Sequence, residues 1–165
     1  MVISKKLQDA INEQINKELY SAYIYLAMSA YCTSINLNGF ARWFKVQFEE
    51  EQAHAFKFMH FVQERRGRVL LKAIEQPQVD FKSIEDVFEI TLKHEEFVTQ
   101  SIYGILELAT GEKDHATVSF LKWFVDEQVE EEAAADEILQ KLLLIKGNPN
   151  GLMALDNALG KRKAD

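Results

Sequence analysis

Residues that interrupt helices are scarce in this sequence, which has two prolines and seven glycines among 165 residues. Because proline and glycine are the strongest breakers of an α-helix, their scarcity allows a few long helices. Hydrophobic residues make up 47% of the chain, enough to bury a substantial core. We therefore expect an all-α protein that forms a single domain over residues 1–165.

Cysteine and long apolar segments are also limited. The single cysteine, Cys32, excludes an internal disulfide and a metal cluster held by several thiolates, and its place on an apolar helix face indicates a small buried side chain. No run of about eighteen uncharged apolar residues occurs, and the amino end lacks the basic-then-apolar order of a secretory signal. We expect a cytoplasmic protein with no membrane partner.

Positive charge is in deficit, since the formal net charge is −7 at pH 7. Nucleic-acid binding needs clustered lysine and arginine, so nucleic acid is not expected as a partner, whereas cations suit the charge. The one basic cluster, Lys161-Arg162-Lys163, is expected to be a solvated tail.

Four long helices are expected at residues 4–32, 39–66, 83–110 and 114–146, with Ser83 and Asp114 suited to cap the third and fourth. Short connections make the first pair and the second pair antiparallel hairpins of a four-helix bundle at residues 4–146. Residues 67–82 contain Pro77 and no helical period, which predicts a long crossover that makes the second and third helices parallel. A short fifth helix, at about residues 151–160, is expected outside the bundle.

Each long helix carries an apolar stripe that polar side chains interrupt near its middle. The interruptions are Glu18, Glu51, Glu95 and the pair Gln128 with Glu131. Counting residues from the two turns places them at matching heights within each hairpin. An ionised carboxylate is very costly to bury without a counter-charge, so four converging acids predict bound cations.

The spacing of these residues favours two metal ions. Glu51 and His54 lie one turn apart on the same helix face, and Gln128 and Glu131 repeat that spacing. Four negative charges balance two divalent ions, and oxygen-rich ligation with one imidazole favours iron or manganese. The other three histidines have no ligand-spaced partner and are expected on the surface or in supporting roles: His60, His94 and His115.

Four segments around these positions resemble the ferritins, specifically the haem-free bacterial and archaeal type. They are NKELYS at residues 16–21, EEQAH at 50–54, KHE at 93–95 and FVDEQVEEE at 124–132. The resemblance covers nearly the whole chain. It implies a ferritin-like bundle that oxidises Fe(II) with O2 or H2O2 at a diiron ferroxidase centre. It also implies a homo-oligomeric cage, twenty-four subunits built from dimers, that stores ferric mineral.

The resemblance also implies roles for single residues. Glu18, Glu51 and His54 would hold the first iron, and Glu51 would bridge to a second iron held by Glu95. Gln128 and Glu131 would complete the surround of that second iron.

Further residues match positions around the family's diiron centre. Tyr25 matches a tyrosine beside it, either as a redox group or as a buried hydroxyl bonded to a carboxylate. Three acids match a third iron site that would share Glu131, and they are Glu50, Glu127 and Glu130. The neighbouring Glu49 and Glu132 are expected to be solvated.

Haem is not expected. Bacterioferritins carry a Glu-x-x-His motif on the fourth helix and a haem-binding methionine directly after the bridging glutamate. Here the fourth helix has Gln128-x-x-Glu131, and Gln52 stands in the methionine's place. Two alternatives remain open at this stage: a diiron oxidase or peroxidase without mineral storage, and a structural metal site without catalysis.

A cage needs contacts between subunits, and the sequence offers two apolar surfaces for them. One is the crossover, with Val69, Leu70, Leu71 and Ile74. The other is the fifth helix, with Leu152, Leu155 and Leu159.

Overall fold

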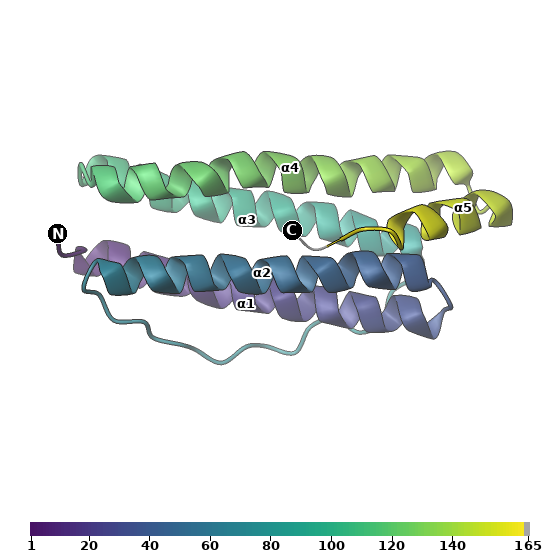
Figure 1. Cartoon of the computed structure of the whole chain (residues 1–165), viewed down its shortest axis with the longest axis horizontal. Helices are drawn as coiled ribbons and strands as arrows, with labels where there is room; N and C mark the ends of the chain where they lie inside the picture. Colours follow the sequence, from purple (N-terminus) through teal and green to yellow (C-terminus); the bar gives the residue numbers. More distant parts are fainter. Residues whose placement is uncertain (164–165) are drawn as a thin grey trace.

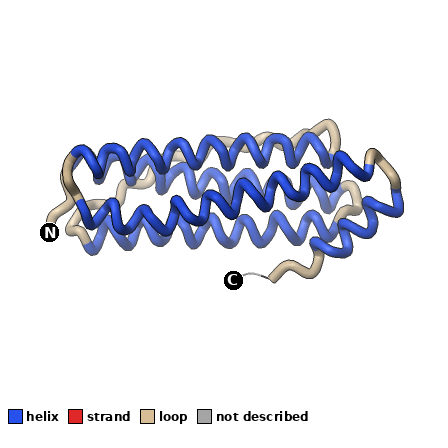
Figure 2. The backbone as a smooth tube through the Cα atoms, turned by 90° about the horizontal axis from the view of Figure 1, so that it is seen from above, coloured by secondary structure: helices blue, strands red, loops and turns tan. Residues whose placement is uncertain are grey.

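The computed structural model describes residues 1–163, which form five helices and, within that range, no strand (Figures 1 and 2). The helices are α1 (Lys5–Ser34), α2 (Asn38–Glu64), α3 (Ile84–Gly111), α4 (His115–Ile145) and α5 (Pro149–Leu159). The predicted all-α bundle of two hairpins is confirmed, and the predicted bounds are close to those observed. None of the helices within residues 1–163 combines the length and apolar character needed to cross a membrane.

Local hydrogen bonds start the helices where the sequence predicts. The Ser83 hydroxyl accepts the Asp86 backbone N–H at 3.2 Å, and the Asp114 carboxylate accepts the Thr117 N–H at 3.0 Å. These caps satisfy backbone donors that have no partner within the first turn. The turn after α1 places Asn36 at a positive φ of 62°, a conformation that asparagine tolerates well.

The long connection between α2 and α3 contains no helix and runs along the outside of the bundle beside α1 (Figure 1). Asn12 of α1 fixes its first part, because its side-chain amide donates to the Arg68 carbonyl and accepts from the Leu70 N–H, both at 3.0 Å. The chain thus returns to the end of the bundle where α2 began. As predicted, α2 and α3 run in the same direction.

A two-point ion pair ties the end of α2 to the start of α4. The Arg65 guanidinium donates to both carboxylate oxygens of Asp114, at 3.0 Å and 2.7 Å. These bonds from Arg65 hold the pKa of Asp114 at about 2. The pair therefore joins the two hairpins at one end of the bundle.

Two apolar clusters fill the bundle on either side of its middle. One, toward α5, contains Phe40, Phe44 and Phe88, and the other contains Leu7, Phe58 and Phe124 among its buried residues. Each fully buried side chain of this size contributes about 1.5–3 kcal/mol to stability. Cys32 is buried in the first cluster, as expected. The two clusters leave a polar layer between them.

The fifth helix packs against its own bundle. Leu155 is buried, and Leu152 and Leu159 pack against the apolar cluster toward α5. The chain itself thus covers Leu155 fully and Leu152 and Leu159 partly, which leaves less of this surface for a contact between subunits than the sequence predicted. Exposed apolar side chains near this end are Leu144 and Met153 instead.

Candidate metal centre

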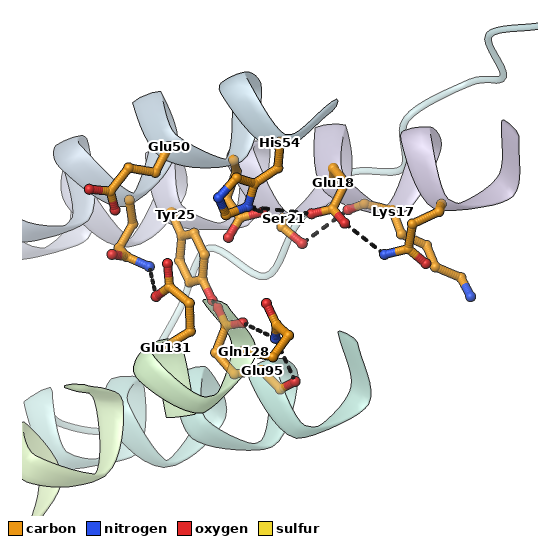
Figure 3. Close-up of polar contacts among 12 residues, drawn as sticks. Lys17, Glu18, Ser21, Tyr25, Glu50, His54, Glu95, Gln128 and Glu131 are labelled. Carbon is orange, nitrogen blue, oxygen red and sulfur yellow. Dashed lines mark hydrogen bonds and ion pairs between the residues drawn. The ribbon is translucent and has the colours of Figure 1, made fainter. Parts of the chain in front are cut away.

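Four buried carboxylates lie in the polar layer, one from each long helix, and Figure 3 labels those of Glu18, Glu95 and Glu131. They are Glu18 of α1, Glu51 of α2, Glu95 of α3 and Glu131 of α4, with exposures of 1%, 2%, 1% and 6%. We call these four residues the acid layer. The sequence register placed them at one level, and the structure brings them together.

Glu18, Glu51 and His54 form the inner group, whose ligand atoms all lie within 4.8 Å of one another. Nδ1 of His54 is 4.0 Å from Oε2 of Glu18 and 3.6 Å from Oε2 of Glu51. Within residues 1–163, both of these carboxylate oxygens are buried without a hydrogen-bond donor from another kind of side chain, and the Glu18 and Glu51 carboxyl groups lie close enough to share a proton. Buried polar atoms are normally paired, so two such oxygens beside an imidazole nitrogen fit a divalent cation.

His54, Glu127 and Glu131 form the outer group, whose ligand atoms also lie within 4.8 Å. Glu127 is only half buried, so this group lies closer to solvent than the inner group. His54 belongs to both groups. The imidazole therefore stands between two places where cations could bind.

Three glutamines orient acids of the layer, each through its amide N–H. The pairs are Gln14 with Glu18 at 2.7 Å, Gln47 with Glu131 at 2.8 Å and Gln128 with Glu95 at 3.1 Å. Sequence reasoning missed the first and second of these glutamines as site residues. A signal existed for Gln14, which precedes Glu18 by four residues, about one helical turn. Gln47 reaches Glu131 on another helix, which helical spacing does not reveal.

Gln128 hydrogen-bonds to the Glu95 carboxylate and so orients it. Its amide nitrogen donates to Oε2 of Glu95 and also lies 3.3 Å from the Thr99 hydroxyl. In this arrangement Gln128 positions a carboxylate.

The second oxygen of Glu95 accepts a hydrogen bond from the Tyr25 hydroxyl. The ring of His94 packs edge-on against Tyr25, with centroids 5.9 Å apart, and its Nε2 lies 2.7 Å from the Ser21 hydroxyl. His94 thus supports Tyr25 and lies outside both ligand groups.

Burial shifts the ionisation of the whole centre. It raises the pKa of Glu18 and, further, that of Glu51, where Glu18 adds its charge. Burial raises the pKa of Glu95 to about 7 and, with the Glu95 charge, that of Glu131 to about 8. Burial also lowers the pKa of His54 to about 4. Metal-free, the layer therefore holds protons at neutral pH, while the imidazole is neutral and able to coordinate a cation.

Hydrogen bonds continue from the acid layer toward the surface on two sides. Lys17 donates to the Ser101 hydroxyl and Ser101 to Oε1 of Gln14, both at 2.6 Å. On the other side, the Thr99 hydroxyl donates to Glu132. The expectation that Glu132 is simply solvated is wrong, because it is half buried and holds the threonine that contacts Gln128.

The remaining predicted acids differ in their surroundings. Glu50 forms an ion pair with Arg162, with Oε2 and Nη2 at 2.6 Å. The prediction of a solvated basic tail is therefore wrong for Arg162. Glu130 is exposed and lies outside both ligand groups. The structure thus brings Glu127 and Glu131 together but leaves Glu130 apart.

A family model described as a ferritin-like domain matches residues 8–145. The chain is 39% identical over 164 residues to a bacterial non-heme ferritin of Staphylococcus aureus, covering 99% of each chain. It is 40% identical over 161 residues to the bacterial non-heme ferritin of Staphylococcus epidermidis, covering 98% of this chain and 97% of the relative.

Solved structures resemble the fold closely. An engineered closed form of the Archaeoglobus fulgidus ferritin matches with a TM-score of 0.98 and 48% identity, covering 99% of each chain. The open pore ferritin of the same archaeon matches with a TM-score of 0.97 and 48% identity, covering 98% of this chain and 99% of that one.

Proposed function

The chain belongs to the ferritin family, and we propose that it oxidises Fe(II) to Fe(III) at the acid layer and stores ferric mineral in a homo-oligomeric cage. The observation that carries the proposal is the pair of buried oxygens on Glu18 and Glu51 beside the His54 nitrogen. A site where buried carboxylates meet a neutral imidazole is suited to a divalent cation, which takes the place of the protons that the carboxylates release. Iron is here the substrate and the cargo.

The proposed ligands divide the acid layer between two irons. Glu18 and His54 hold the first, Glu51 bridges, and Glu95 with Glu131 holds the second. Two Fe(II) ions then balance four carboxylates, and their electrons pass to O2 or H2O2. A third iron is proposed at the outer group, where Glu127 and Glu131 approach His54 and where Glu50 and Glu130 are nearby in the sequence.

The chain's own residues prepare this reaction. Gln14, Gln47 and Gln128 hold three carboxylates in fixed orientations, so little reorganisation is needed when iron binds. Because burial raises the pKa of the acids, Fe(II) binding displaces protons from them. The apolar clusters on both sides exclude bulk water.

Storage requires a closed shell, because one bundle cannot enclose a mineral. The crossover supports a dimer contact, since Leu70, Leu71 and Ile74 expose 45%, 63% and 41% of their surface. Exposed apolar side chains next to one another are typical of a surface that a partner covers. We propose a cage of twenty-four subunits built from such dimers, each subunit being a single domain.

Aerobic loading with Fe(II), followed by size separation with iron detection, tests the proposal. Iron that co-migrates with a large protein shell is the expected result. Rapid Fe(II) oxidation without retained iron would instead indicate a diiron oxidase or peroxidase that does not store mineral. Bound metal without any oxygen consumption would indicate a structural site.

A further inference from the structure

The end of α5 is fixed closely against the start of α2. The carboxylate of Asp156 accepts the Phe40 backbone N–H at 3.0 Å. A Cβ atom added at Gly39 would lie only 1.7 Å from the Asp156 carbonyl oxygen, so this approach requires glycine. Residues 160–163 therefore run back from α5 alongside α2, toward the middle of the bundle (Figure 1).

Arg162 uses this position to reach Glu50. Its Nη2 lies 2.6 Å from Oε2 of Glu50, its guanidinium lies over the Trp43 ring at 4.6 Å, and its carbonyl accepts from Arg42 at 3.4 Å. The side chains of Arg162 and Glu50 are only 25% and 19% exposed. The pair is therefore more sheltered than an ordinary surface ion pair, and three contacts define where Arg162 lies.

Among the residues that the structure describes, none accepts a hydrogen bond from the buried Nη1 atom of Arg162, so this guanidinium nitrogen still has donor capacity. A cation is thus already paired with Glu50, which directly precedes Glu51 in the sequence.

We propose that Arg162 is a built-in counter-cation for Glu50, and that a metal ion that recruits Glu50 to the outer position displaces Arg162 and frees residues 160–163. The inference rests on the proposed function, since it concerns the third iron. A carboxylate oxygen bonded to a guanidinium is a weaker ligand, and a like charge nearby opposes a second cation. Arg162 therefore makes the outer position weaker and reversible.

Zn(II) titration of the assembled, metal-free protein by calorimetry tests the competition without redox chemistry. In the parent protein we expect two tight steps and one weaker step per chain. Arg162→Gln should strengthen the weaker step about tenfold and leave the tight steps unchanged. Lys161→Gln and Lys163→Gln are matched controls, because each removes the same charge from an exposed position of the same tail.

Hydrogen exchange followed by mass spectrometry tests the displacement itself. The Lys161 and Arg162 N–H groups bond to the Ala158 and Leu159 carbonyls at 3.2 Å and 3.1 Å. Zn(II) at the level of the weaker step should speed exchange in the peptide after Ala158, and in Arg162→Gln that exchange should be fast before Zn(II) is added.

The outcomes separate this inference from the proposed function. The role of Arg162 would be overturned if both proteins showed two tight steps and Arg162→Gln did not strengthen the weaker step. It would also be overturned if neither protein showed a weaker step. In both cases the diiron proposal would stand. Unchanged exchange of the tail on Zn(II) binding would also overturn it. Absence of the tight steps would instead contradict the proposed centre.

Discussion

Tyr25 of α1 donates a hydrogen bond to Oε1 of Glu95 on α3, across the contact between the two hairpins. Gln128 of α4 donates to Oε2 of the same carboxylate at 3.1 Å. Both bonds favour the charged carboxylate, whereas burial, the larger effect, raises its pKa to about 7. Glu95 is thus held in one orientation by two other helices.

Tyr25→Phe should destabilise the metal-free protein by about 1–2 kcal/mol, because Oε1 of Glu95 loses its donor while staying buried. Denaturant unfolding measures the loss. Tyr103→Phe is the control, since Tyr103 is 37% exposed, and it should change little. If Tyr25→Phe unfolded like the control, the hydrogen bond would have no energetic role.

Glu51→Ala should lower the rate of Fe(II) oxidation about a hundredfold, because it removes the carboxylate that is proposed to bind both irons. Stopped-flow absorbance after mixing with aerobic Fe(II) measures the rate. Glu137→Ala is a suitable control, because Glu137 is 66% exposed and pairs with Lys141 on the same helix. Parent-like oxidation by Glu51→Ala would refute the assignment.

Stability of the metal-free protein should fall as the pH rises from about 6.5 to 8. Burial raises the pKa values of Glu95 and Glu131 to about 7 and 8 in the folded protein, above the ordinary glutamate value of 4.5. The folded state therefore keeps protons that the unfolded state has already released, and each rise in pH favours unfolding. A slope of about 1–3 kcal/mol per pH unit is expected.

The pH window is chosen to isolate the carboxylates. The lowered pKa of His54, about 4, acts in the opposite direction below about 6.5, where the unfolded imidazole takes up a proton. Saturating Zn(II) should flatten the slope, and Glu131→Gln should reduce it. A stability that rises from pH 6.5 to 8 without metal would count against a protonated acid layer.

Leu71→Glu should weaken the proposed dimer. Leu71 is 63% exposed on the crossover, so the substitution costs the monomer little but places two like charges across a two-fold contact. Light scattering should show smaller species than the parent. Val129→Glu is the control, because it adds the same charge at a 65% exposed position on α4 and shows whether a negative charge placed elsewhere also weakens assembly. Assembly unaffected by Leu71→Glu would exclude this face as the dimer contact.

Ionic strength should shift the balance between small species and the cage. Each subunit carries a net charge of −7, so neighbouring subunits repel one another, and salt screens that repulsion. Light scattering across a salt series should show growth toward the cage. A monomer of 19.0 kDa under every condition, with or without iron, would contradict both cage and storage.

The sequence by itself determined the helices, their caps and the level of the acids. These features are local, because the 3.6-residue period decides which side chains share a face and short turns decide which residues come level. Glu18 and Glu51 could thus be matched by counting from one turn. The four-residue spacing of Gln14 and Glu18 also shows from the sequence that these two side chains share a helix face.

Only the tertiary structure decided which long side chains meet. Gln47 bonds to Glu131, 84 residues away, and Arg162 reaches Glu50 from 112 residues away. The tertiary structure also decided that the α5 leucines pack against their own bundle and that Glu132 accepts a hydrogen bond from the Thr99 hydroxyl. Such contacts depend on how helices are rotated against one another and on which rotamers the packing allows, and the helical period fixes neither.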